Sequence, residues 1–159
     1  MRSSVDIHTH LVELGVPHEF FRLARLARTP ADMAAELSVD PRSFAIAHVL
    51  TGRITLSVAL TSLGETVDEE AASNAMGGRL QRATPAIASL ITGFPAHWVP
   101  PVAVEPDLAT LIDSSLAEHP VVYGSAGESG LAIAVRVDSL LRETKAVVAS
   151  ITRPVVSMV

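Results

Sequence analysis

The sequence contains no cysteine. This absence excludes a disulfide framework, an iron–sulfur cluster, a cysteine-ligated zinc site and a thiol nucleophile. Lysine is almost missing as well, because Lys145 is the only lysine among the 12 basic residues. The net charge of −5 argues against a broad nucleic-acid-binding face, since phosphate contacts need clustered Lys and Arg side chains, and we expect no binding to DNA.

The sequence also lacks long apolar runs and linkers. No stretch approaches the roughly 18 consecutive apolar residues of a transmembrane helix. The first six residues lead into no apolar segment of the secretory type. We therefore expect a cytoplasmic protein that does not enter a membrane. With no internal repeat or low-complexity tract, residues 1–159 are expected to form a single domain.

The composition that remains favours a large aliphatic core. Hydrophobic residues make up 48% of the chain and aromatic residues only 4%, so Val, Leu, Ile and Ala must fill the interior. Charged residues amount to 18%, below the average of about 25%. So little charge suggests that part of the surface is covered, for instance in a homodimer.

Helix-start signals alternate with β-rich runs along the chain. Thr-Pro pairs at residues 29–30 and 84–85 are typical of an N-cap followed by proline at the first helical position. Helices are expected over residues 4–14, 29–37, 68–76, 84–91 and 138–142, the last capped by Asp138. Strands or short extended pieces are expected over residues 18–23, 44–51, 54–61, 79–83, 108–112, 121–124, 131–137 and 146–151. The second and third form a hairpin with a Gly52-Arg53 turn. This order predicts an α+β fold with a mixed sheet.

The segment Thr92–Pro101 is the most unusual local sequence. It holds three of the ten prolines, the only tryptophan, a histidine and a glycine. Prolines fix φ and remove N–H donors, so the loop has a defined shape and suits a small ligand. The alternative is a stiff connection that packs Trp98 onto the core.

Few other residues have the spacing of a catalytic or metal site. His48 shares a strand face with Ile46 and Leu50, which by itself is typical of a core or solvated histidine. Asp113 ends a hydrophobic strand, a position found both in functional sites and in ordinary turns. His8 and His10 point to different sides of their helix, and we expect no metal site and no cofactor. The segment 125–130 is expected to be a hairpin turn rather than a phosphate cradle.

Taken in order, these features resemble the YbaK/prolyl-tRNA synthetase-associated domain, a family of free-standing and appended aminoacyl-tRNA editing domains. The resemblance covers about Val5 to Ile151. It is carried by Gly15-Val16-Pro17-His18-Glu19, by the helix Ala31–Val39, by Thr92-Gly93-Phe94 and Pro101, by Leu111-Ile112-Asp113, by Tyr123–Gly127 and by Val135–Leu141. The family fold implied is a curved mixed, largely antiparallel sheet flanked by helices.

The resemblance implies a reaction as well as a fold. Members of the family hydrolyse the ester of a mischarged tRNA and remove a small amino acid such as Cys or Ala. A strand lysine contacts the substrate, and a Gly-x-x-x-Pro loop places backbone groups around the aminoacyl ester. The expected partners are therefore the 3′ end of an aminoacyl-tRNA and an aminoacyl-tRNA synthetase.

This chain departs from the family pattern at both central points. The lysine position falls on His48, and the glycine of the Gly-x-x-x-Pro loop falls on His97. We expect His48 to act as the catalytic group, as polar contact or general base, while His97 and Trp98 narrow the pocket. By the same resemblance, the other substrate-binding residues are Thr92, Gly93, Pro101, Asp113 and Gly127.

Two alternatives stay open at this point. One is a non-catalytic relative that binds a small ligand, a tRNA end or a synthetase, which the acidic charge and the missing lysine favour. The other is a scaffold, which only the low charge content supports. If RNA binds, the local candidates for contact are Arg22, Arg25, Arg28, Arg79 and Arg82.

Overall fold

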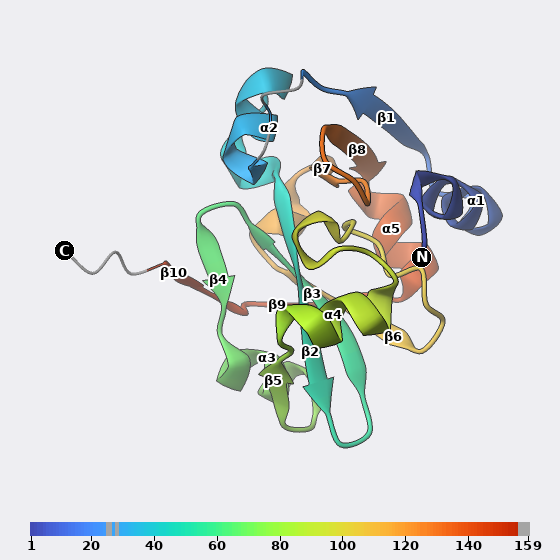
Figure 1. The fold of residues 1–159 in the computed structure, drawn as a ribbon. Coiled ribbons are helices and arrows are strands. Elements are labelled where there is room, and N and C mark those ends of the chain that lie inside the picture. The colour runs from blue at the N-terminus through green and yellow to red at the C-terminus, as the bar shows by residue number, and fades with distance from the viewer. Residues whose placement is uncertain (25–26, 28, 156–159) are drawn as a thin grey trace.

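The computed structural model describes residues 1–24, 27 and 29–155, coloured along the chain in Figure 1. The helices are α1 (Ser4–Leu14), α2 (Pro30–Leu37), α3 (Glu69–Met76), α4 (Pro85–Thr92) and α5 (Val137–Thr144), with 3-10 turns η1 (Pro41–Ser43), η2 (Ala96–Trp98) and η3 (Leu116–Glu118). The strands are β1 (His18–Arg22), β2 (Ala45–Gly52), β3 (Leu56–Ser62), β4 (Glu65–Val67), β5 (Leu80–Arg82), β6 (Leu108–Asp113), β7 (Val121–Ser125), β8 (Leu131–Arg136), β9 (Val147–Ala149) and β10 (Thr152–Pro154).

The strands form one central sheet and two smaller ones. The central sheet has the order β5-β2-β3-β6-β9, with antiparallel pairing from β5 to β3 and parallel pairing from β3 to β9. The smaller sheets, β1-β8-β7 and β10-β4, are antiparallel. Figure 1 shows α2, β1 and β8 at one end of the molecule and α3 with β5 at the other. The predicted α+β class with a mixed, largely antiparallel sheet is confirmed.

The helix starts follow the capping signals in the sequence. The side chains of Thr29, Asp68 and Thr84 each accept a hydrogen bond from a backbone N–H in the first turn of the helix that follows. These bonds satisfy N–H groups that have no partner inside the helix. At the other end of α4, Gly93 takes the left-handed conformation that ends a helix, with φ of 80°.

Three local predictions need correction. The β2–β3 turn is centred on Arg53-Ile54 rather than on Gly52-Arg53, because the Gly52 N–H donates to the Thr55 carbonyl at 2.9 Å. Asp138 does not cap α5; the N-cap is Arg136, and Asp138 lies in the first turn. The expected strand over residues 146–151 is shorter, and a further strand, β10, follows it and pairs with β4.

The core lies on both faces of the central sheet. On one face Val58, Leu60 and Ile112 belong to a large cluster that also includes residues of α1 and α5. On the other face Ala59 and Leu111 pack with residues of α3 and with Val67 of β4. Since β3 is buried almost throughout, it gives β2 a fixed support on one side. Among the described residues, no helix is long and apolar enough to cross a membrane.

Candidate functional site

A cleft of about 620 Å³ lies along β2 and is the largest hollow that contains residues expected at the site. One wall is β2 itself, and the others come from the start of α2, from α4 with the residues before it, from η2 and from the end of β7. Its lining residues are Thr29, Pro30, Ala45, Ile46, Ala47, His48, Val49, Arg82, Ala83, Pro85, Ala88, Ala96, His97, Trp98, Val99 and Ser125. A volume in this range fits a small-molecule ligand or the end of a larger one.

The cleft follows the edge of β2 rather than one of its faces. Successive side chains of a strand point to opposite faces, yet the five consecutive residues from Ala45 to Val49 all line the cleft. On this side β2 pairs with β5 only through Leu50–Gly52. Between the Ala83–Val49 hydrogen bond and the bridge from Phe44 to Tyr123, this edge of β2 lies beside the cleft.

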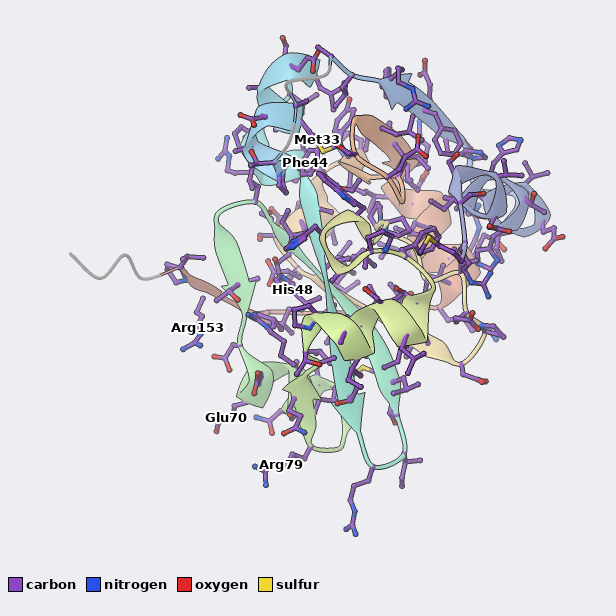
Figure 2. All side chains as sticks on the ribbon, in the orientation of Figure 1. Met33, Phe44, His48, Glu70, Arg79 and Arg153 are labelled. Atoms are coloured by element: carbon purple, nitrogen blue, oxygen red, sulfur yellow. The ribbon has the colours of Figure 1, made fainter. Side chains whose placement is uncertain are left out.

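His48 lies at the middle of β2 and is held by a neighbouring strand. Figure 2 labels it between the Met33–Phe44 end of the molecule and the Arg79 end. The ring Nε2 is 2.9 Å from the Oγ1 of Thr61 on β3. Burial, with a smaller contribution from the nearby Arg82 charge, lowers the pKa of His48 to about 4. The ring is therefore neutral at pH 7.

His97 and Trp98 reach the same cleft from the Pro-rich loop. Both belong to η2, whose turn is closed by a hydrogen bond from the Trp98 N–H to the Pro95 carbonyl at 2.9 Å. His97 is exposed and Trp98 is half-buried. The Gly127 N–H donates to the Trp98 carbonyl, also at 2.9 Å, and so ties the loop to the β7–β8 turn.

Gly127 supports this loop from behind and does not line the cleft. Its φ is +89°, and an added Cβ would lie 2.9 Å from the ring of Phe94. A side chain here would strain the backbone and displace Phe94, which is buried in the core. Gly127, which was expected to bind substrate, therefore lies behind the loop and helps to fix the loop's shape.

Thr92 and Gly93 lie at the end of α4, outside the cleft lining. The Thr92 hydroxyl donates to the Ala88 carbonyl at 2.9 Å and is buried. The Gly93 carbonyl accepts a hydrogen bond from the Arg2 N–H at 3.0 Å. Both residues end the helix and start the loop.

Pro101 and Asp113 also lie outside the cleft lining. Pro101 packs on Gly124 of β7, where an added Cβ would approach the proline ring to 2.8 Å. Asp113 is 2% exposed and accepts hydrogen bonds from the backbone N–H groups of Ile151 at 3.0 Å and Ser115 at 3.2 Å. Its carboxylate thus joins the end of β6 to the segment between β9 and β10. The structure brings His48, His97 and Trp98 together in the cleft. Asp113 instead accepts backbone hydrogen bonds outside the cleft lining.

Several lining residues carry no sequence signal for a site. Ala83 and Ala88 are unremarkable in composition, and Ser125 was expected in a turn and within the Tyr123–Gly127 family motif, but not as a site residue. Arg82 was considered only as a contact for RNA; it lines the cleft and also donates to the Thr66 hydroxyl. The strand pairing that leaves part of β2 open is a long-range feature that no local pattern reveals.

The lining of the cleft carries fixed charge of one sign only, which is positive. Arg82 is the one residue with a fixed charge in the lining, which contains no Asp or Glu. Within the described part of the chain, no group of three or more His, Asp and Glu side chains could hold a metal ion. The chemistry available at this site is therefore that of backbone groups, neutral imidazoles, a hydroxyl and one guanidinium.

The other arginines considered for RNA contact are scattered. Arg22 forms an ion pair with Glu128 at 2.9 Å on an exposed surface. Arg79 lies at the far end of the molecule from Met33 and Phe44 (Figure 2). Arg25 and Arg28 lie outside the described residues.

The fold is shared with solved structures of similar size. A hypothetical protein superposes with a TM-score of 0.85 at 21% sequence identity, over 93% of this chain and 99% of that chain. A candidate trans-editing enzyme for prolyl-tRNA synthetase superposes with a TM-score of 0.84 at 24% identity, over 96% of this chain and 98% of that chain. At these identities the likeness establishes the fold.

The family follows from a second comparison. The family model described as the aminoacyl-tRNA editing domain matches residues 24–143 of this chain. The chain therefore belongs to the aminoacyl-tRNA editing domain family, as the order of its sequence motifs predicts.

Proposed function

We propose that this protein hydrolyses the ester bond of a mischarged aminoacyl-tRNA in the cleft beside β2, and that the amino acid removed is small. The observation that carries the proposal is the convergence of His48, His97 and Trp98 on one cleft. Of these, His48 and His97 stand at the two positions where the chain departs from the family pattern. Membership of the editing-domain family supports hydrolysis of an aminoacyl ester as the reaction, and the cleft is large enough to hold such an ester.

The reaction needs a water positioned against the ester carbonyl. The water oxygen attacks the carbonyl carbon, the bond from that carbon to the ribose oxygen breaks, and the ribose oxygen takes the proton. Positioning of reactants and stabilisation of the developing oxyanion supply most of such a rate enhancement. Neither step requires a cofactor.

His48 is better suited to orienting this water than to accepting its proton. A general base works best with a pKa near the working pH, and the pKa of His48 is lowered to about 4. The Thr61 hydroxyl lies 3.5 Å from the Glu65 carbonyl, which accepts its hydrogen. Nε2 of His48 then carries the ring proton and donates to Thr61, so that Nδ1 keeps a lone pair for the water.

The loop side of the cleft would select the size of the amino acid. His97 replaces a residue without a side chain in the family pattern, and Trp98 is the bulkiest group in the lining. Both reduce the space at the loop, which favours small acyl groups. Arg82, which lines the cleft from the end of β5, would contact the terminal phosphodiester of the tRNA, an electrostatic role that its positive charge suits. Recruitment by a synthetase and a homodimeric state belong to the same proposal.

The test is a deacylation panel of tRNAs mischarged with small amino acids. Wild type should hydrolyse at least one ester faster than buffer alone, and His48→Ala should lose about tenfold or more, the scale of one positioning contact. His10→Ala is the matched control, because His10 lies on α1 outside the cleft lining. Equal rates for wild type and His48→Ala would remove His48 from the mechanism.

A second function, ligand binding without turnover, is favoured by one observation. The family lysine is replaced by a neutral, half-buried imidazole, which is a weaker electrostatic group than an ammonium. In that case wild type would hydrolyse none of the esters, and His48→Lys would gain activity. The same panel therefore separates the two functions.

A further inference from the structure

Arg2 contacts the chain on both sides of the Pro-rich loop. Its backbone N–H donates to the Gly93 carbonyl at 3.0 Å, where the loop leaves α4 (Figure 1 shows the N-terminus near this end of the helix). Its Nε donates to Oε1 of Glu105 at 3.0 Å, and its Nη2 donates to the same oxygen. Glu105 follows Pro101 by four residues. A single residue of the N-terminal segment therefore ties the start of the loop to the chain just beyond its end.

The side chain of Arg2 lies directly against Gly93. A Cβ added to Gly93 would lie 2.9 Å from Cγ and 3.0 Å from Cδ of Arg2. Gly93 thus has two reasons to lack a side chain, which are its φ of 80° and the space that the Arg2 stem occupies. Long basic side chains commonly pack their stem on the protein while the charged end reaches a partner. Here the packed stem fixes the point at which the chain enters the loop.

The ion pair between Arg2 and Glu105 stands out because the loop has no fixed charge of its own. Residues 83–104 contain no Asp, Glu, Lys or Arg, so Glu105 is the first such residue after Arg82. The side chains of Arg2 and Glu105 are 31% and 34% exposed, so water screens the pair only in part. A guanidinium that donates through two nitrogens also restricts the geometry more than a single contact does. Any ionic attachment of the loop therefore has to come from its flanks.

Buried side chains hold much of the loop but leave its tip free to depend on the flanks. Phe94 and Val99 are buried in the core. Between them, His97 is exposed and Trp98 is half-buried, and both line the cleft. Their position therefore depends on how the chain enters this short span, and Arg2 holds that entry one residue before Phe94.

We infer that Arg2 is a positioning residue for the cleft: through Gly93 and Glu105 it holds the Pro-rich loop where His97 and Trp98 narrow the cleft. Without Arg2 the loop is less restrained, and the cleft admits larger groups. The effect of Arg2 on the loop is independent of any reaction, whereas its effect on the choice of amino acid rests on the proposed function.

The fluorescence of Trp98 tests the effect on the loop, because Trp98 is the only tryptophan in the chain. In Arg2→Ala its emission should shift to longer wavelength, and acrylamide, an uncharged quencher, should quench it more strongly. Arg2→Glu combined with Glu105→Arg should restore the wild-type signal, since the ion pair forms again with its charges exchanged. Arg142→Ala is the matched control and should change nothing, because it removes an exposed ion pair with Glu143 on α5, outside the loop and the cleft lining.

Salt provides a second readout, to which a role in packing alone would not respond. At 1 M salt the Debye length is about 3 Å, so an ion pair between partly exposed groups is weakened. Quenching of Trp98 should therefore rise with salt in wild type and stay constant in Arg2→Ala. Equal quenching of wild type and Arg2→Ala at low salt would overturn the inference, whether or not the protein deacylates tRNA.

Selectivity tests the part that rests on the proposed function. If wild type deacylates mischarged tRNA, Arg2→Ala should lower the ratio of kcat/KM for an alanyl ester to that for a leucyl ester by about fivefold, the upper range for a partly exposed ion pair. Arg142→Ala should keep the wild-type ratio. An unchanged ratio in Arg2→Ala would overturn the role of Arg2 in selecting the amino acid. Failure of wild type to hydrolyse any ester would refute the proposed function, and Trp98 fluorescence would still decide whether Arg2 positions the loop.

Discussion

Substituting Gly124 by alanine tests how the Pro-rich loop is held against the sheet. Gly124 lies on β7 beneath Pro101, and an added Cβ would lie 2.8 Å from both Cδ and Cγ of the proline ring. Favourable contacts between carbon atoms begin near 3.5 Å. The proline ring cannot rotate away, so either the loop or β7 must shift.

The expected cost follows from these distances. Overpacking of a well-packed core lowers the free energy of unfolding by about 1–3 kcal/mol. Replacing glycine by alanine raises it by about 0.4–1 kcal/mol, because alanine reduces the conformational entropy of the unfolded chain. The net loss is about 1–2 kcal/mol, which for a chain of this size corresponds to a fall in Tm of roughly 2–8 °C. Because the Trp98 side of the loop lines the cleft, deacylation should fall as well.

Thermal unfolding followed by circular dichroism measures this loss. Gly78→Ala is the matched control, because no heavy atom lies within 4 Å of a Cβ added there. Its Tm should equal or exceed that of wild type. A Gly124→Ala protein that melts no earlier than Gly78→Ala would refute the packing of Pro101 on β7.

Three further predictions concern individual side chains. His48 should titrate near pH 4 by ¹⁵N NMR, whereas its pKa in the unfolded chain is about 6.5. The free energy of unfolding should therefore fall by up to about 3 kcal/mol as the pH is lowered from about 6.5 to about 4, because the unfolded chain binds the proton first. His48→Gln should lack this fall. Thr61→Val should disturb the fixed Nε2–H tautomer of His48 in the same spectra, whereas Thr61→Ser should keep it, and an unchanged tautomer in both would contradict the hydrogen bond at 2.9 Å. Asp113→Ala should cost about 1–3 kcal/mol in chemical denaturation because it leaves the buried Ile151 N–H without a partner, yet the deacylation rate of the folded protein should not change; a loss of rate without a loss of stability would instead place Asp113 in the site.

The parts of the fold that depend on local chemistry were predictable. Thr29, Asp68 and Thr84 begin helices because their side chains satisfy nearby N–H groups, and Gly93 ends a helix because it adopts a positive φ at little cost. The hairpin was predicted, but its turn was displaced by one residue. Position 52 keeps its place in the ladder because its N–H still bonds to Thr55.

The candidate site was predictable only in part. His97 and Trp98 stood out because the loop has an unusual composition, and His48 stood out through the family resemblance. The cleft itself depends on β5 covering only Leu50–Gly52 of β2, which is a tertiary arrangement. The partner that fixes the His48 ring, Thr61, is likewise brought close by strand register. Neither feature has a signal in the local sequence.

The most direct test of the proposed function is the single-turnover rate at which this protein deacylates tRNAs that have been mischarged with alanine or cysteine. We expect hydrolysis by wild type well above the uncatalysed rate, and a loss of about tenfold or more in His48→Ala with no change in His10→Ala. Hydrolysis at the uncatalysed rate by wild type, for every ester in the panel, would contradict it.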